Sequence, residues 1–248
     1  MTRVAVLGAK GRMGSTSAAA IEAADGLELV AGIDVGDELE AIAEAQAEAV
    51  LVFTTPDVAF DQARWCLERG IHVVIGTSGF GDEKVAQLRE IVSGHEGVGA
   101  LVVPNFSIGA VLMMRFAAVA APFFESVEVI EMHHPDKVDA PSGTAVRTAE
   151  LIAEARREAG SAALPDATTT DPDGARGAKV EGIPVHALRA RGFIASQEVV
   201  LGDPGEIFSI RHDSSSRESF MPGVVAALQW IPEHPGVTVG LDEVLELD

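Results

Sequence analysis

The sequence predicts an α/β protein with a Rossmann-like, parallel-sheet dinucleotide-binding domain and an α+β domain with an open mixed sheet. Two observations lead to this prediction. Up to about residue 103, short apolar runs alternate with helical patterns, and alternation at this spacing is typical of right-handed crossovers in a parallel sheet. After Asn105 the alternation stops, and three β-rich runs separated by glycine-bearing turns lie between residues 184 and 212. An open sheet of that kind needs covering, either by its own helices or by another subunit.

Composition excludes several classes of protein. The chain has 248 residues, of which 47% are hydrophobic, so it is long enough for one or two compact domains. A single cysteine, Cys66, excludes an internal disulfide framework and a multi-cysteine zinc site. The formal net charge of −20 repels nucleic acid and anionic membranes at long range. The sequence contains no apolar run long enough for a membrane span or a signal peptide, so we expect a cytoplasmic protein without nucleic-acid or membrane partners.

The elements of the first domain follow from short apolar runs and helix boundary signals. Strands are expected at residues 3–7, 27–34, 49–54, 72–76 and 98–103. Helices are expected at residues 13–24, 37–48, 56–69 and 82–92. Pro56 suits the first turn of its helix, and Gly70 suits the left-handed position that follows the end of the same helix.

The second domain is expected to begin with a helix at residues 108–121. A strand at residues 127–132 then ends at a polar cluster, and a long helix covers residues 143–159. Residues 160–178 are rich in Ala, Thr, Asp, Pro and Gly, which predicts a surface loop. The β-rich runs are residues 184–188, 197–201 and 207–212, and a last helix at residues 224–230 precedes an acidic tail.

A glycine loop, VAVLGAKGRMG, lies between the first strand and the first helix. Gly8 permits a tight turn, Gly11 lets the backbone approach a pyrophosphate, and Gly14 lets the helix pack closely on the strand. The spacing GxxGxxG is one residue away from the usual fingerprint, and a structural turn is the alternative. Asp34 ends the second strand, 20 residues after Gly14, where a carboxylate that binds a ribose is expected. This placement favours a dinucleotide site.

Two more loops follow predicted parallel strands at their carboxyl ends, where ligands bind in open α/β sheets. They are GTSGF, beginning at Gly76, and PNFS, beginning at Pro104. Either loop alone is more typical of an ordinary turn. Their position beside the glycine loop favours contact with the nicotinamide or its ribose.

The densest polar segment is EMHHPDKVDAPSGT, which begins at Glu131. Adjacent histidines suggest a metal site, but neighbouring strand residues point to opposite faces, and no cysteine or third histidine lies nearby. A solvated polar turn is a second alternative. An anion site is favoured, because Lys137 and a histidine supply positive charge. In addition, Ser142, Gly143 and Thr144 supply hydrogen-bond donors at a helix N-terminus. The same Lys and His provide a proton donor and a proton acceptor.

These motifs together closely resemble the 4-hydroxy-tetrahydrodipicolinate reductase family, formerly called dihydrodipicolinate reductases. The resemblance covers nearly the whole chain, and HHxxKxDAPSGTA is its most specific part. By resemblance, His133 is the proton donor or acceptor and Lys137 is a proton donor. The substrate-binding positions are His134, Gly143 and Thr144, with Ser142 adjacent. The cofactor-binding positions are Gly8, Ala9, Lys10, Gly11, Arg12, Met13, Asp34, Gly76, Thr77, Ser78, Val103, Pro104, Asn105 and Phe106.

The resemblance implies reduction of a cyclic dicarboxylate by NADH or NADPH, in diaminopimelate and lysine biosynthesis. It also implies a homotetramer formed through the open sheet and a C-terminal helix that returns to the first domain. We therefore expect residues 1–106 and 214–248 to form the dinucleotide-binding domain and residues 107–213 to form the substrate-binding and tetramerisation domain. No metal is expected.

The sequence departs from the family pattern at two positions. Ser78 replaces a threonine in GTTGF and keeps its hydroxyl, whereas Val52 replaces a carboxylate that often precedes Phe53. Two rival functions are weaker. A semialdehyde dehydrogenase needs an activated cysteine in a loop, but Cys66 is mid-helix, and a silent nucleotide-sensing module is expected to lack His133 and Lys137.

Overall fold

The computed structural model describes residues 1–247 and divides the chain into two compact units. The first unit contains Met1–Ile108 together with the C-terminal part of the chain from Arg217 onward. The second unit is Gly109–Ser216. No helix in the described residues is both long enough and apolar enough to span a membrane.

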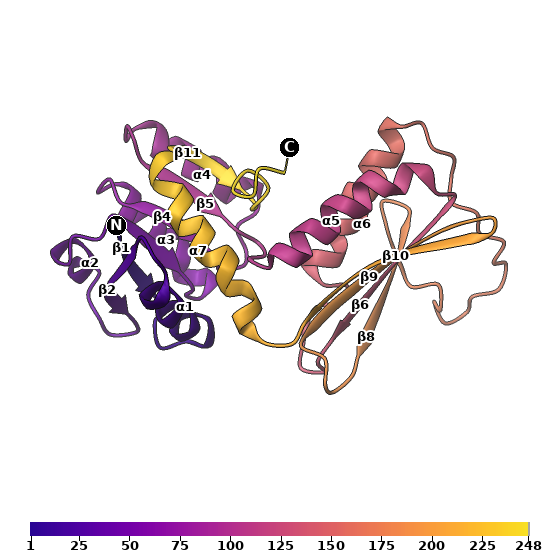
Figure 1. The fold of residues 1–248 in the computed structure, drawn as a ribbon, viewed down its shortest axis with the longest axis horizontal. Coiled ribbons are helices and arrows are strands. Elements are labelled where there is room, and N and C mark those ends of the chain that lie inside the picture. The colour runs from indigo at the N-terminus through magenta and orange to yellow at the C-terminus, as the bar shows by residue number, and fades with distance from the viewer. Residues whose placement is uncertain (248) are drawn as a thin grey trace. The chain divides into compact units, whose positions relative to one another are not determined.

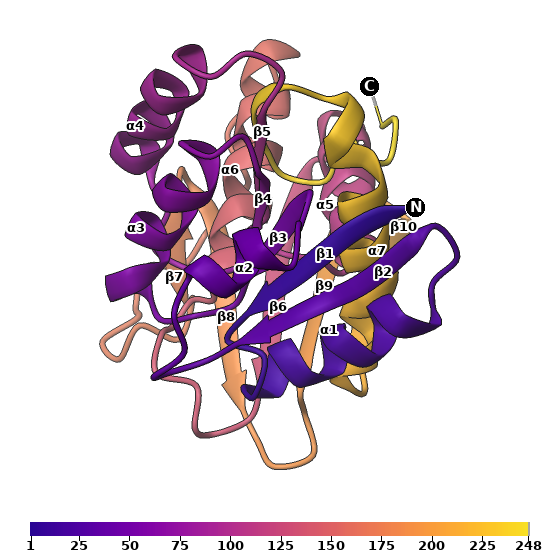
Figure 2. The same cartoon turned by 90° about the vertical axis from the view of Figure 1, so that its left-hand side faces the viewer.

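The first unit is built on a six-stranded parallel sheet, as predicted, with the order β11-β5-β4-β3-β1-β2 (Figures 1 and 2). Its strands are β1 (Thr2–Leu7), β2 (Leu27–Ile33), β3 (Ala49–Val52), β4 (His72–Ile75), β5 (Gly99–Val102) and β11 (Gly236–Val239). Its helices are α1 (Arg12–Ala23), α2 (Glu40–Glu44), α3 (Pro56–Leu67), α4 (Asp82–Ser93), α7 (Met221–Trp230) and the short 3₁₀ segments η2 (Arg217–Phe220) and η3 (Ile231–Glu233). Every strand therefore ends at the same edge, where the three predicted loops begin.

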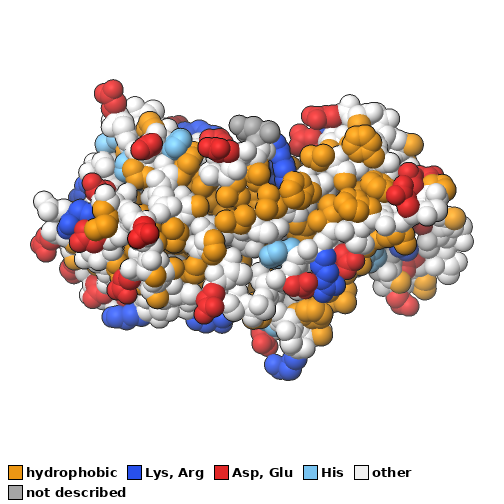
Figure 3. Space-filling model, in the orientation of Figure 1, with side chains coloured by type: hydrophobic (Ala, Val, Ile, Leu, Met, Phe, Trp, Pro, Cys, Tyr) orange, Lys and Arg blue, Asp and Glu red, His pale blue; other side chains and the backbone are white. Residues whose placement is uncertain are grey.

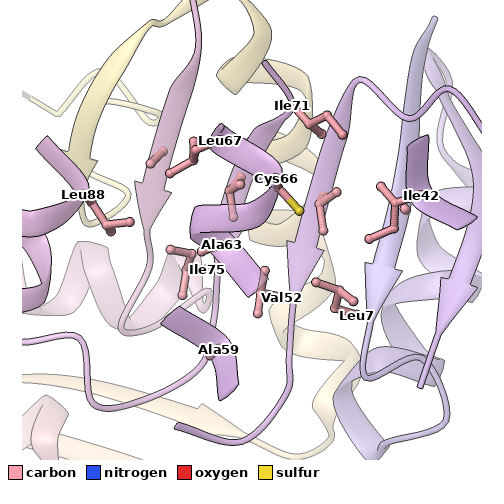
Figure 4. Close-up of a cluster of buried hydrophobic side chains, with 14 of the residues drawn as sticks. Leu7, Ile42, Val52, Ala59, Ala63, Cys66, Leu67, Ile71, Ile75 and Leu88 are labelled. Carbon is pink, nitrogen blue, oxygen red and sulfur yellow. The ribbon is translucent and has the colours of Figure 1, made fainter. Parts of the chain in front are cut away.

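Helices cover both faces of this sheet (Figure 2). Side chains of α2, α3 and α4 pack on one face against alternate strand residues such as Leu7, Val52 and Ile75 (Figure 4). Helices α1 and α7 contact each other and β1. Cys66 is fully buried in the α3 side of this core, and burial raises the pKa of its thiol to about 12. That environment makes Cys66 a packing residue rather than a nucleophile.

Two predictions for the first unit are wrong. The helix expected at residues 37–48 is only Glu40–Glu44, because Gln46 has a positive φ of 53° and the Arg3 guanidinium donates to the carbonyls of Ala45 and Gln46. The expected acidic tail contains β11, which pairs in parallel with β5 and extends the sheet. Gly70 does adopt the predicted left-handed conformation, with φ 73°.

The second unit contains the predicted mixed sheet, in the order β10-β9-β6-β8-β7. Its strands are β6 (Ser126–His133), β7 (Ala178–Val180), β8 (Ile183–Arg189), β9 (Ala195–Asp203) and β10 (Glu206–Ser214). Strands β6 and β8 are parallel, whereas the other pairs are antiparallel. The short strand β7 was not predicted.

Within the described residues, both long helices of this unit pack on the same face of the sheet (Figure 1). They are α5 (Ile108–Ala120), which the 3₁₀ segment η1 (Ala121–Phe123) follows, and α6 (Gly143–Glu158). Hydrophobic side chains, including the exposed Phe116 and Val119, gather over α5 (Figure 3). Residues of β6 alternate in burial, so Val127, Val129 and Glu131 face the helices.

Candidate active site

The glycine loop folds tightly between β1 and α1. Gly8 has a φ of +81°, and its carbonyl accepts a hydrogen bond from the Gly11 N–H at 2.9 Å. A Cβ atom on Gly14 would lie 2.0 Å from that same carbonyl oxygen. Helix α1 therefore packs against the loop backbone at a distance that only glycine permits at this position.

The N-terminus of α1 fits a phosphate group. The N-cap residue of α1 is Gly11, which has no side chain to accept from the first N–H groups of the helix, and the first turn of α1 contains no acidic residue. Helices α3 and α4 in the same unit differ, because the first turn of α3 contains Asp57 and that of α4 contains Asp82. The first N–H groups of α1 and the positive end of its dipole thus suit an anion. Lys10 and Arg12 are exposed in the same loop.

The carboxylate of Asp34 lies directly beside the glycine loop. Its Oδ2 accepts from the backbone N–H of Lys10 at 2.7 Å, and its Oδ1 accepts from that of Val35 at 2.9 Å. The hydrogen bonds from Val35 and then Lys10 lower the pKa of Asp34, so this carboxylate is ionised at neutral pH. The structure thereby joins residues that are 24 positions apart into one arrangement with the chemistry of a ribose site.

The loops after β4 and β5 meet around two aromatic rings. Phe53 and Phe106 pack edge to face with centroids 5.5 Å apart. A Cβ atom on Gly76 would lie 2.1 Å from the Phe53 ring and 2.6 Å from the Phe106 ring, so Gly76 makes room for the pair. The Thr77 hydroxyl donates to the carbonyl of Thr54 at 3.0 Å, which fixes the loop after β4 to the end of β3.

The other predicted cofactor positions surround these rings or the glycine loop. Asn105 accepts a hydrogen bond from the Ser107 N–H through its Oδ1 at 2.9 Å. Val52 is fully buried in the core of the first unit. Of the remaining positions, Ala9 and Met13 flank Gly11 at the start of α1, Ser78 follows β4, and Val103 and Pro104 follow β5.

The predicted acid–base group His133 is the last residue of β6 in the second unit, and Glu131 contacts its ring. Its Nδ1 lies 2.5 Å from Oε2 of Glu131, two residues earlier on the same face of the strand. Burial lowers the pKa of His133, and the nearby cations Lys137 and Arg189 add to that effect, while Glu131 opposes it. The net effect lowers the pKa of His133 from its ordinary value, which favours the neutral ring.

The loop between β6 and α6 holds two other predicted site residues, Lys137 and His134. Lys137 Nζ donates to Asp139 Oδ1 at 2.7 Å, and this bond is the largest cause of the lowered pKa of Asp139. His134 lies beyond the end of β6, about half exposed, with its Nδ1 4.0 Å from Asp136. Consecutive histidines thus have separate surroundings. No three Asp, Glu, His or Cys side chains in the described residues are arranged to hold a metal ion.

Helix α6 begins where the sequence predicted, at Gly143. The Ser142 hydroxyl caps it by accepting from the Ala145 N–H at 3.2 Å, and the Ser142 N–H donates to Glu131 Oε1 at 3.2 Å. Gly143 and Thr144 form the first turn, which contains no acidic residue. These features suit an anionic group at the end of the helix.

Sequence reasoning did not select Glu131, Arg189, Phe53 or Asp139 as site residues. Glu131 could have been found, because it precedes His133 by two residues and so shares its face of the strand. Arg189 could not, since its place beside Glu131 depends on the parallel register in which His133 pairs with Arg189. Phe53 is signalled only by its position at the end of a strand.

Comparison with known families matches the chain in two consecutive parts. The N-terminal model of dihydrodipicolinate reductase covers residues 2–106, and the C-terminal model covers residues 109–245. The chain belongs to the dihydrodipicolinate reductase family. It is therefore an NAD(P)H-dependent oxidoreductase, and its N-terminal part is the NAD(P)-binding Rossmann domain of this family.

Members of the family are similar over their full length. The 4-hydroxy-tetrahydrodipicolinate reductase of Streptomyces coelicolor is 56% identical over 246 residues, which are 99% of this chain and 98% of that one. The Corynebacterium urealyticum reductase is 52% identical over 248 residues and 100% of both chains. A solved structure of dipicolinate-bound dihydrodipicolinate reductase from Paenisporosarcina sp. TG-14 is 38% identical, with a TM-score of 0.85 over 98% of this chain and 99% of that chain.

Proposed function

We propose that the chain reduces 4-hydroxy-tetrahydrodipicolinate to tetrahydrodipicolinate, with loss of water, at the expense of NADH or NADPH in diaminopimelate and lysine biosynthesis. The observation that carries this proposal is the full-length likeness to reductases of that name. The cluster of His133, Lys137 and the N-terminus of α6 supports it, because it combines anion binding with proton transfer.

The substrate is a dicarboxylate, and the second unit offers several groups that suit it. Dipicolinate, bound in the related Paenisporosarcina structure, is itself a small dicarboxylate. One carboxylate fits the Ser142–Thr144 turn at the N-terminus of α6. The other carboxylate can be bound by Lys137 and His134. There it competes with Asp139 for the Lys137 ammonium group. These local donors oppose the net charge of −20, which repels an anionic substrate at long range.

Proton transfer falls to His133 and Lys137. Lys137 carries three N–H donors and is the proton donor in this proposal. His133 presents its Nε2 for exchange, because its Nδ1 is occupied by Glu131. When the dinucleotide binds, its nicotinamide supplies the hydride. The first unit holds it through the glycine loop, Asp34, and the loops that contain Gly76–Ser78 and Val103–Phe106.

A homotetramer formed through the second unit is part of the proposal. The helices α5 and α6 cover one face of its sheet, and residues such as Ile207 and Leu188 are exposed on β10 and β8. Exposed apolar side chains on an uncovered sheet face favour a partner subunit. A cytoplasmic location also stays a prediction.

A coupled assay that forms the substrate from pyruvate and aspartate semialdehyde tests the function. We expect oxidation of both NADH and NADPH, with kcat/KM for NADH equal to or better than that for NADPH by less than about tenfold. Asp34 accepts ribose hydroxyls and repels a 2′-phosphate. The exposed Lys10 and Arg12 offset that repulsion. Because salt screens exposed charges, added salt should weaken the binding of NADPH more than the binding of NADH. If the chain were a silent nucleotide-sensing module, neither cofactor would be oxidised. A preference for one cofactor above about a hundredfold contradicts the role given to Asp34 or to the pair Lys10 and Arg12.

Replacing Thr144 with valine should raise the KM for the substrate more than it lowers kcat. The hydroxyl stands in the first turn of α6, where it is proposed to bind a carboxylate equally in the ground and transition states. Steady-state kinetics at saturating NADH measure both parameters. A collapse of kcat at constant KM contradicts carboxylate binding at this turn.

A further inference from the structure

The carboxylate of Glu131 is the centre of the hydrogen-bond network in the second unit. Its side chain is 0% exposed, yet it accepts four hydrogen bonds. Oε2 accepts from His133 Nδ1 at 2.5 Å and from Arg189 Nη1 at 2.8 Å. Oε1 accepts from Arg189 Nη2 at 2.8 Å and from the Ser142 N–H at 3.2 Å. The acceptor positions of a carboxylate are thus fully used.

This network determines which nitrogen of His133 carries the proton. Burial raises the pKa of Glu131, but the hydrogen bonds from Arg189 and His133 outweigh burial and lower it overall, so Glu131 is ionised and only accepts. The nitrogen that faces it, Nδ1, must therefore be protonated in both charge states of the ring. Nε2 is left as the one ring atom that gains or loses a proton.

Arg189 makes a buried carboxylate tolerable next to a site for anions. Its guanidinium binds Glu131 with two parallel hydrogen bonds, so the pair adds no net charge near the N-terminus of α6. Arg189 Nη2 also donates to the carbonyl of Asp139 at 2.8 Å, which fixes the loop that carries Lys137. One ion pair thereby positions the strand end, the loop and the helix start.

We propose that Glu131 is a positioning residue for the reduction, which holds His133 as the Nδ1–H tautomer, and that Arg189 holds Glu131 in place. The proposal rests on the proposed function in so far as that function makes His133 an acid–base group. The charged groups that face His133 are Glu131 on its own strand, Arg189 on β8, and Lys137 on the loop after β6.

The same strand supplies a matched control. Glu128 accepts from His186 Nε2 at 2.6 Å and from the Arg176 guanidinium, so it forms a second Glu–His–Arg cluster. Glu128 and Glu131 are three residues apart on β6 and therefore point to opposite faces of the sheet. A change at Glu128 removes a similar ion pair from the same strand without touching His133.

The first experiment uses the unmodified protein labelled with ¹⁵N in its histidine rings. We expect the neutral His133 ring, assigned by comparison with His133→Asn, to show the shifts of the Nδ1–H tautomer. Neutral His133 observed as the Nε2–H tautomer overturns the proposal. This readout does not depend on turnover. If the tautomer is as expected but the coupled assay shows no reduction, the proposed function fails while the arrangement of His133 stands.

The second experiment compares Glu131→Gln with Glu128→Gln. A glutamine cannot accept from His133 and Arg189 at both of its ends. Loss of the carboxylate also removes a group that favours the charged ring, so the ionisation of His133 in the kcat profile should move to lower pH by about one unit or more. We expect kcat to fall about 10- to 100-fold, which is less than the ~10²–10⁴-fold contribution of a positioned acid–base group because His133 itself stays in place, with the KM for NADH within about twofold.

Glu128→Gln should keep the wild-type pH profile. A wild-type kcat and pH profile in folded Glu131→Gln overturns the proposal, as does an equal shift in both variants. If Glu131→Gln does not fold, Arg189→Lys replaces it. That change keeps the positive charge but loses the bidentate fork, so it should lower kcat in the same direction, and a wild-type kcat and pH profile in folded Arg189→Lys overturns the proposal.

Discussion

Replacing Lys137 with alanine is expected to lower kcat by about 10²- to 10⁴-fold, the contribution of a positioned proton donor, while the affinity for NADH stays within about twofold. Lys137 belongs to the second unit, whereas the glycine loop and Asp34 belong to the first, so cofactor affinity and turnover should separate. Single-turnover kinetics and a fluorescence titration with NADH measure the two quantities.

Lys179→Ala is the matched control for Lys137→Ala. Lys179 also belongs to the second unit and lies 3.8 Å from a carboxylate, that of Asp166, but it is more exposed than Lys137 and has no proposed role in the reaction. We expect wild-type turnover from it. Equal turnover in Lys137→Ala and Lys179→Ala contradicts the role of Lys137 as a proton donor.

Gly14→Ala is expected to destabilise the first unit and to abolish measurable NADH binding at concentrations that saturate the wild type. The added Cβ would lie 2.0 Å from the backbone oxygen of Gly8. Gly8 has no room to retreat, because a Cβ at its own position would lie 2.6 Å from the carbonyl oxygen of Phe53. The cost in unfolding free energy should reach or exceed the ~1–3 kcal/mol typical of overpacking.

The control for this substitution is Gly81→Ala. Gly81 is the N-cap residue of α4 in the first unit, whereas Gly14 is the third residue of α1, and a Cβ on Gly81 meets nothing within 4 Å. Urea unfolding and NADH titration of both variants make the comparison. If Gly14→Ala unfolds at the same urea concentration as the wild type and binds NADH equally well, the loop is not the rigid cradle described above.

Local patterns were sufficient to predict most elements because they carry their own boundary signals. Pro56 and Gly70 bracket α3, and Ser142 caps α6 at the predicted residue. Where a residue far away in the sequence determines the end of an element, the local sequence pattern gives the wrong boundary. The Ala/Glu-rich run at residues 37–48 has helical composition, but contacts from Arg3 close the helix early. Strand β11 is four residues long and exists because β5 offers it an edge.

The residues of the candidate site that are close in sequence could be predicted, and those brought together by strand pairing could not. Groups that are adjacent in sequence, such as the glycine loop and the segment from His133 to Thr144, were selected directly from their spacing. Asp34 was selected because the distance from a glycine loop to the end of the next strand is nearly constant. Arg189 was not, since its partner Glu131 lies 58 residues away and only the register of β6 with β8 brings the two together.

The place of β11 has a consequence for synthesis on the ribosome. Strand β5 pairs with β11, and α7 packs on α1 and β1, yet both β11 and α7 follow the entire second unit in the chain. A nascent chain that has emerged only as far as Ile108 therefore has an unpaired β5 edge and an uncovered α1. During the time needed to translate more than a hundred further residues, at about 5–20 residues per second, the exposed edge is open to pairing with other chains. The first unit is thus the first to begin folding and the last to finish.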